Sequence, residues 1–320
     1  MNCNFKSLPI PYHKTLEVID TTKLKTFCDC PRKFLFEYAI GWRSEYPSNH
    51  LVFGEAWHRA LAQIYVTNFS TTSIMDAYEN YFLPYYRNTF PPTTDELFGG
   101  KTPENALLAL IQYAEKYKSD FLKYKVLFAE VAGSAFVTDT QEIFFRIDLV
   151  LEDDENRIFA GEHKTGGKMF YSWPDQWLLD LQPGTYTHAL RSYFADKEVR
   201  GVLMNGTFFQ QLKKGPKIEF NRVPVWKTNE QMLYWLTTVN SIISEIEANF
   251  NFLETEKPSD NVLRSFRMNP GNCTKYSGCP YRDFCEVWPN PLNKLDSVPN
   301  GFAINHWDPR EVEARHKINV

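Results

Sequence analysis

The sequence predicts a mixed α/β fold in which a helical N-terminal region precedes a central sheet. Up to about residue 125, apolar side chains recur at helical spacing. Between residues 125 and 226, short segments rich in β-branched and aromatic residues alternate with turn-forming stretches. With 320 residues, of which 43% are hydrophobic, the chain can bury a large core. We therefore expect a sheet flanked by helices.

The first region contains three helical segments. The stretch from Asp20 to residue 42 is expected as a helix in two parts, because Pro31 disfavours helical backbone in the residue before it. Residues 51–69 place Phe53, Trp57 and further apolar side chains on one helical face. A third helix, residues 102–124, begins with Thr102 as the cap and a proline after it.

Strands are expected at residues 125–137, 142–152 and 157–165, joined as sequential hairpins by the turns TDTQ and DDEN. A helix within 182–195 follows, and its start is open because Pro183 and Gly184 lie there. A strand pair, 199–212 and 217–226, precedes a long helix over 229–250. The pattern predicts a mixed sheet.

The overall charge does not indicate a polycation. Lysine and arginine number 35 against 39 acids, a net charge of −4, so nucleic-acid binding requires local basic patches. The sequence contains no run of about 18 apolar residues and no signal-peptide pattern. We expect no membrane contact and a cytoplasmic location, or an intracellular location as a phage-encoded protein.

The stretch RIFAGEHKTGG carries an acid and a base two residues apart on one strand face, Glu162 and Lys164. An exposed pair of this kind contributes at most about 1 kcal/mol, so a surface ion pair is one reading. The other reading is that Glu162 and Lys164 form half of an active site. On the preceding strand Asp148 shares a face with Arg146. Two carboxylates beside a lysine favour Mg²⁺ or Mn²⁺ and suit phosphodiester hydrolysis.

These residues resemble the signature of the PD-(D/E)xK nuclease superfamily, and other positions resemble its RecB-like branch, which includes AddB-type and CRISPR-associated exonucleases. GEAWHRAL at 54–61 resembles that branch's G-x-x-x-H-x-x-L motif, and QPGTY at 182–186 resembles its Q-x-x-x-Y motif. The order of these motifs along the chain is also the family's order.

The resemblance implies a restriction-endonuclease-like core and a role for each matched residue. The Nε2 atom of His58, the carboxylates of Asp148 and Glu162, and the backbone carbonyl of His163 would bind Mg²⁺ or Mn²⁺. Lys164 would assist the attacking water. Further candidates are Glu130 for a second metal, and Gln182 and Tyr186 for positioning the DNA strand or supporting Lys164.

Six cysteines lie near the two ends of the chain, which in an intracellular protein indicates a metal or cluster site rather than disulfides. The resemblance implies a 4Fe-4S cluster on Cys30, Cys273, Cys279 and Cys285, with Cys28 as an alternate to Cys30. Zinc and unligated thiols are the alternatives. Such a cluster would close a loop of about 240 residues and stabilise the fold by roughly 5 kcal/mol.

We thus expect one integrated domain with three parts: a helical region (1–125) with the first cluster cysteine and the histidine motif, a nuclease core (126–252) and a cluster-binding segment with a tail (253–320). The expected activity is metal-dependent exonucleolytic cleavage of single-stranded DNA in recombination, repair, phage or CRISPR-related processing. A helicase, recombination or CRISPR protein is the expected partner. The alternatives are a DNA-binding scaffold of the same fold and a nuclease gated by the cluster's redox state.

The segment KMFYSWPDQW contains aromatic residues that are candidates for stacking on bases, and Trp173 and Trp177 are equally candidates for the core.

Overall fold

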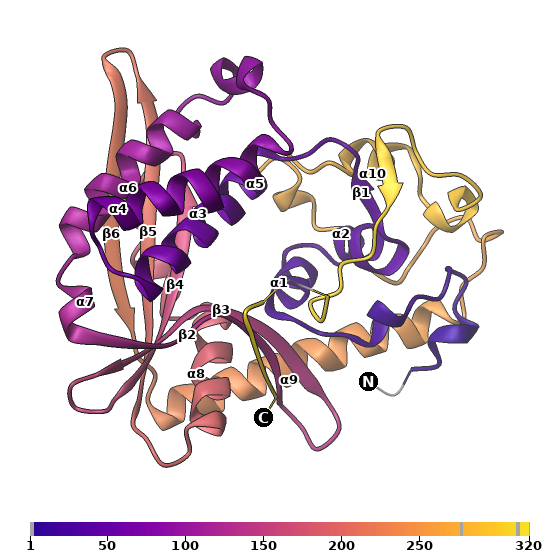
Figure 1. Cartoon of the computed structure of the whole chain (residues 1–320). Helices are drawn as coiled ribbons and strands as arrows, with labels where there is room; N and C mark the ends of the chain where they lie inside the picture. The colour runs from indigo at the N-terminus through magenta and orange to yellow at the C-terminus, as the bar shows by residue number, and fades with distance from the viewer. Residues whose placement is uncertain (1–2, 276–277, 312–313, 320) are drawn as a thin grey trace. The chain divides into compact units, whose positions relative to one another are not determined.

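The computed structural model describes residues 3–275, 278–311 and 314–319, and they form two compact units. One unit comprises Met1–Tyr46, Ser134–Phe145 and Asn229–Val312. The other comprises Pro47–Gly133, Arg146–Thr228 and Glu313–Val320, and we call it the sheet unit. The first, which contains all six cysteines, we call the cysteine unit. Each is described by itself below (Figure 1).

The sheet unit is built around a mixed six-stranded sheet of order β6-β5-β4-β3-β2-β8. β4 pairs antiparallel with β3 and parallel with β5, which pairs antiparallel with β6. The strands are β2 (Tyr124–Phe136), β3 (Glu142–Asp153), β4 (Ile158–Gly166), β5 (Val199–Leu212), β6 (Gly215–Val225) and β8 (His316–Asn319). The α/β fold with a mixed sheet and flanking helices is confirmed. The three strands expected as sequential hairpins are neighbours in the sheet, as predicted.

Helices cover this sheet. Their bounds are α3 (Asn49–Val66), α4 (Thr71–Asp76), α5 (Leu83–Arg87), α6 (Pro103–Tyr117), α7 (Asp120–Lys123) and α8 (Leu181–Tyr193), with a π-helical turn at Ala77–Phe82. In Figure 1, α3 and α6 lie across β4 to β6. α8 packs on β4 and β5.

The core of the sheet unit follows the predicted helical stripe of α3. Phe53, Trp57, Leu61 and Ile64 are fully buried. The rings of Phe53 and Trp57 pack edge-on against Phe209 of β5, with ring centroids 4.8 and 5.4 Å away. Burying a large apolar side chain stabilises a fold by about 1.5–3 kcal/mol. This packing fixes α3 on the sheet and so fixes the direction of its polar side chains.

The cysteine unit holds α1 (Thr21–Asp29), α2 (Pro31–Phe34), a π-helical turn at Leu35–Ile40, α9 (Asn229–Leu253), α10 (Arg282–Val287) and a two-stranded sheet of β1 (Trp42–Ser44) and β7 (Phe302–Ile304). The break at Pro31 and the long helix from residue 229 are confirmed. The rings of Phe27, Phe34, Phe250 and Phe266 pack together and join α1, α2 and α9 to the chain beyond α9.

None of the helices in the described ranges is both long and apolar enough to cross a bilayer.

Candidate metal and catalytic site

Asp148 and Glu162 lie beside each other on neighbouring strands. The β3–β4 register pairs Leu149 with Gly161, so Asp148 and Glu162 are the next residues on each strand. Both carboxylates are 3% exposed. The backbone N–H of His163 donates to Oδ2 of Asp148 at 2.7 Å, which fixes the orientation of that carboxylate. Two buried carboxylates therefore converge at the point where β3 and β4 part.

His58 projects from α3 onto this pair. Its Nδ1 lies 2.9 Å from Oδ1 of Asp148. Burial alone would lower the pKa of His58, but the neighbouring carboxylate of Asp148 outweighs it and raises the pKa to about 9. For Asp148, burial favours the neutral form, but the charge and hydrogen bond of His58 hold its pKa well below the usual range. Without a metal ion, the two therefore form an ion pair that is buried on the Asp148 side and half-buried on the His58 side. The expected use of Nε2 as the metal ligand stays a prediction.

Glu130 is the third carboxylate of the group, and its backbone is strained. It has a φ of +53° within β2, a left-handed conformation that a non-glycine residue adopts at a cost of about 1–3 kcal/mol. Its Oε2 accepts from Nε of Arg146 at 3.2 Å. Its Oε1 is buried and has no hydrogen-bond partner among the residues that the structure describes. One ligand atom each from Glu130, His58 and Asp148 lie within 4.8 Å of one another.

This donor set fits a divalent cation. The two carboxylates are the ligand type that Mg²⁺ and Mn²⁺ prefer, and the imidazole adds one nitrogen donor. Burial and the nearby charge of Asp148 raise the pKa of both Glu130 and Glu162, because three carboxylates repel one another in a buried site. A cation would reduce that repulsion and could be coordinated by the free oxygen of Glu130. Glu162 lies outside the tight group of three, and the carbonyl of His163 stays a predicted ligand.

Each oxygen of Glu162 already has a donor. Lys164 Nζ lies 2.5 Å from Oε1, and Gln182 Nε2 donates to the same oxygen at 2.9 Å. The hydroxyl of Tyr186 lies 3.0 Å from Oε2 and also contacts the carbonyl of Arg146. Burial lowers the pKa of Lys164, but Glu162 outweighs burial and raises it above its usual value, so the ammonium stays charged. The Glu162–Lys164 pair is thus buried at its acidic end and is not a surface ion pair.

Gln182 and Tyr186 share one face of α8. The helix begins at Leu181 with Asp180 as its cap, whose side chain accepts from the N–H of Gln182 at 2.9 Å. Pro183 is tolerated because the first turn of a helix has no intrahelical acceptor for its N–H groups. Nε2 of Gln182 donates to the hydroxyl of Tyr186 at 2.6 Å. The open question of where this helix starts is therefore answered, and the Q-x-x-x-Y residues lie side by side.

Two residues that the sequence reasoning missed hold Glu130 in place. Arg146 forms a forked pair with Glu55 of α3, with both N–O distances at 3.0 Å, and also bonds Glu130. Because the guanidinium is shared by two carboxylates, it orients Glu130 without neutralising it fully. A signal existed, since Arg146 shares a strand face with Asp148 and Glu55 lies within the GEAWHRAL motif.

A second missed network lies behind the His163 side of β4. Arg222 of β6 forms a forked pair with buried Asp120 at 2.9 and 2.6 Å, and Tyr65 donates to the same carboxylate at 2.6 Å. Arg222 also donates to Asn205 of β5, the residue paired with His163 in the sheet. Tyr65, Asp120 and Asn205 are buried and Arg222 is half-buried, and the network supports the strand that carries the site.

The imidazole of His163 is 1% exposed and lies between aromatic rings. Its ring centroid is 5.9 Å from Tyr65 and 6.0 Å from Tyr113. Burial lowers its pKa to about 3, so the ring is neutral. Neither ring nitrogen has a hydrogen-bond partner within the described part of the chain. The ring thus belongs to the core, on the opposite strand face from Glu162.

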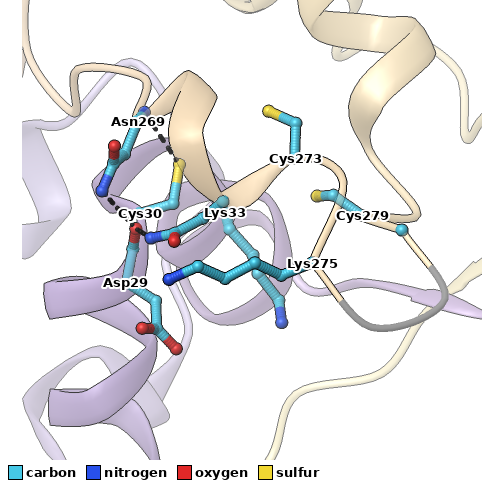
Figure 2. Close-up of a pocket in the computed structure, with 9 residues that line it drawn as sticks. Asp29, Cys30, Lys33, Asn269, Cys273, Lys275 and Cys279 are labelled. Atoms are coloured by element: carbon cyan, nitrogen blue, oxygen red, sulfur yellow. Dashed lines mark hydrogen bonds between the residues drawn. The ribbon is translucent and has the colours of Figure 1, made fainter.

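In the cysteine unit, Cys30, Cys273 and Cys279 line one pocket of about 320 Å³ (Figure 2). In that view their sulfur atoms point toward a common space. The N–H of Asn269 donates to the sulfur of Cys30 at 3.4 Å. Cys28 is exposed and is not among the residues that line this pocket. In the described ranges, no three of the thiol sulfurs lie within 4.8 Å of one another.

Cys285 interacts electrostatically with these thiols. Burial raises its pKa to about 11, Arg32 opposes the shift, and the thiols of Cys30, Cys279 and Cys273 add to it. The buried guanidinium of Arg32 donates from Nε to the carbonyl of Phe266 at 2.9 Å. Arg32 thereby ties the segment after Cys30 to the chain that leads into the C-terminal cysteines.

Comparison with known proteins places the geometry in a family. No curated protein matches the chain. The solved structure titled "Crystal structure of SSO0001" covers 73% of this chain and 78% of its own length at 13% identity, with a TM-score of 0.31. The family model of the PD-(D/E)XK nuclease superfamily matches residues 21–286, a span that contains every residue of the site described above. The chain therefore belongs to the PD-(D/E)XK nuclease superfamily.

Proposed function

We propose that this protein is a Mg²⁺- or Mn²⁺-dependent nuclease that hydrolyses phosphodiesters of DNA, acting as an exonuclease on single strands. One observation carries the proposal. Half-buried His58 and buried Glu130 and Asp148 converge around a free carboxylate oxygen of Glu130, and the charged amine of Lys164 stands beside them on Glu162. Burying these charges costs free energy because each must be desolvated, and a bound cation would offset part of that cost.

The residues divide the chemistry between them. His58, Asp148 and Glu130 would hold the metal ion, with Glu162 and the carbonyl of His163 as further ligands. The ion would supply charge neutralisation at a phosphoryl oxygen. Lys164 keeps its proton, so it orients the attacking water and stabilises negative charge by donating hydrogen bonds.

Gln182 and Tyr186 act on the site indirectly, by hydrogen-bonding the carboxylate of Glu162. Their donors occupy both of its oxygens, which restricts rotation of the carboxylate. A carboxylate held at one orientation keeps Lys164 at one place on the strand. Support of Glu162 and Lys164 is therefore their proposed role.

Cleavage of end-labelled oligonucleotides tests this proposal. Single strands labelled at the 5′ or the 3′ end, and the corresponding duplex, are incubated with Mn²⁺, Mg²⁺ or EDTA. We expect metal-dependent shortening of the single strand from one end. Absence of cleavage with either metal would contradict nuclease activity, and cleavage at internal positions only would contradict the exonuclease assignment.

We further propose that Cys30, Cys273, Cys279 and Cys285 bind a 4Fe-4S cluster. Three of these thiols line one pocket, and the fourth interacts with them electrostatically. A tetrahedral zinc ion, with Zn–S bonds of about 2.3 Å, brings its sulfurs to about 3.8 Å of one another. Among the described residues, no three of these sulfurs all lie within 4.8 Å of one another. A four-iron cluster, which binds each sulfur to a separate iron, suits that spacing better.

Iron and labile sulfide measured on anaerobically purified protein test this assignment. We expect about four of each per chain in the wild type. Cys273→Ser should lose them, whereas Cys28→Ser, which changes an exposed cysteine on α1, should retain them. Colourless wild-type protein without iron would contradict the cluster, and so would equal loss in the two variants.

A further inference from the structure

The segment between β4 and α8 has both of its ends fixed at the catalytic carboxylate. Lys164, near the end of β4, and Gln182, in the first turn of α8, both bond Oε1 of Glu162. Residues 167–180 therefore leave the site and return to it. We call them the 167–180 loop.

The base of this loop is anchored in the sheet unit. Trp173 is 9% exposed and Trp177 is 6% exposed, so both occupy core positions. Their ring centroids lie 5.3 Å apart, and Trp173 packs edge-on against Phe208 of β5 at 5.4 Å. Gly206 makes room for this packing, since a Cβ there would stand 2.7 Å from the ring of Trp173.

The tip of the loop has the opposite character. Phe170 is 64% exposed and Tyr171 is 100% exposed. Neither ring has an aromatic or cationic ring contact in residues 3–275, 278–311 and 314–319. Exposed Lys168 and Gly167 connect this tip to Lys164. Two unpartnered aromatic rings thus stand beside a lysine on a firmly anchored base.

We propose that Phe170 and Tyr171 form a stacking platform for unpaired bases of the strand that enters the site. This inference rests on the proposed nuclease function and deepens it, because it assigns single-stranded nucleic acid as the ligand of this loop. Aromatic faces stack on any base, and a nearby lysine attracts the phosphates between bases. A duplex presents no free base face, so the platform favours unpaired strands.

The position of the platform limits which bases it touches. Tyr171 is seven residues from Lys164, and an extended chain spans at most about 3.6 Å per residue, or roughly 25 Å. A DNA strand rises 3.4 Å per nucleotide in a duplex and more when it is stretched. The contacted bases therefore lie within about seven nucleotides of the cleaved bond.

Binding measured without cleavage tests the platform. Fluorescence anisotropy in EDTA follows wild type and the double variant Phe170→Ala/Tyr171→Ala on a labelled single strand. A second strand of equal length is abasic over the seven nucleotides next to the cleaved bond. On the normal strand we expect the double variant to bind at least about tenfold more weakly. On the abasic strand, wild type and the double variant should bind alike.

Two further variants separate stacking from general apolar contact. Tyr171→Trp keeps an aromatic face and should bind like wild type. Leu179→Ala changes an equally exposed apolar residue of the same loop, 80% exposed, and should also bind like wild type.

The failures are distinguishable. Equal binding of wild type and the double variant to the normal strand overturns the platform, and so does an equal loss on the abasic strand. If wild type cleaves single strands while either result holds, only the platform is wrong. If wild type neither binds nor cleaves single strands, the proposed function itself is wrong.

Discussion

We predict that His58 sets the pH dependence of metal binding at the proposed site. In the metal-free protein its ring is protonated and paired with Asp148 at 2.9 Å, and its pKa is raised to about 9. A metal ion binds only the neutral imidazole. If His58 is a ligand of the ion, binding at neutral pH would therefore release one proton from its ring. Protonated His58 is then the positive partner of Asp148, and a bound metal ion would take over that role.

The magnitude follows from that pKa. At pH 7, two units below a pKa of about 9, roughly 1% of the rings are neutral. The apparent affinity for the metal is then about 100-fold below its limit, which is about 2.7 kcal/mol. Affinity should rise about tenfold per pH unit from pH 6.5 and should level off above pH 9. Without a raised pKa, the rise would end near pH 6.5.

Isothermal titration calorimetry with Mn²⁺ measures this directly. Titrations at pH 6.5 to 8.5, each in two buffers of different protonation enthalpy, give both affinity and protons released. Wild type should release about one proton at pH 7. His58→Gln, which cannot be protonated, should bind more weakly and release fewer protons by about one. An affinity of wild type that does not change with pH would refute the reasoning, as would an unchanged slope in His58→Gln.

Two other side chains give independent predictions. Tyr186→Phe removes the hydroxyl that contacts Glu162 and should lower kcat about tenfold, the equivalent of one hydrogen bond to a charged group, with the fold unchanged by circular dichroism. Asp120→Asn removes the buried countercharge of half-buried Arg222 and should lower the free energy of unfolding by about 3 kcal/mol, measured by urea denaturation.

Exposed positions supply the matched controls for both. Tyr193→Phe changes a tyrosine of the same helix that is 41% exposed, and should leave kcat unchanged. Glu115→Gln breaks an exposed pair with Lys118 and should change the free energy of unfolding by less than about 1 kcal/mol. If Tyr186→Phe behaves like Tyr193→Phe, the support of Glu162 by Tyr186 has no catalytic consequence. A stable Asp120→Asn variant would show that Arg222 finds another partner.

Much of the fold could be predicted because local patterns determine it. Segments rich in β-branched and aromatic residues, separated by turn-forming stretches, predicted β2, β3 and β4, and the spacing of Phe53, Trp57 and Leu61 predicted the buried face of α3. The chain order of the motifs then indicated that Asp148, Glu162 and His58 would meet. These signals are short range, and the structure brings all three together.

The supporting residues could not be predicted in the same way. Arg146 and Glu55 are separated by 91 positions, and Arg222 and Asp120 by 102. Their contacts depend on how the helices pack on the sheet, which no local pattern encodes. Glu130 reaches the metal group through a left-handed backbone conformation, whereas strand alternation assumes an extended one.

The aromatic segment after β4 shows the same limit. The composition of this segment did not decide whether Trp173 and Trp177 belong to the core or stack on bases. In the structure both side chains are buried. Which aromatic residues face solvent depends on the loop's anchor at Phe208 and Gly206, on a strand that follows about 30 residues later.

The most direct test of the site is the cleavage rate of Lys164→Ala on a single strand under saturating Mn²⁺ and substrate. Lys214→Ala, in the exposed turn between β5 and β6, is the control. We predict that Lys164→Ala slows cleavage by at least about 100-fold, as expected for removal of one preorganised donor, while Lys214→Ala cleaves at the wild-type rate. Full activity of Lys164→Ala would contradict the account.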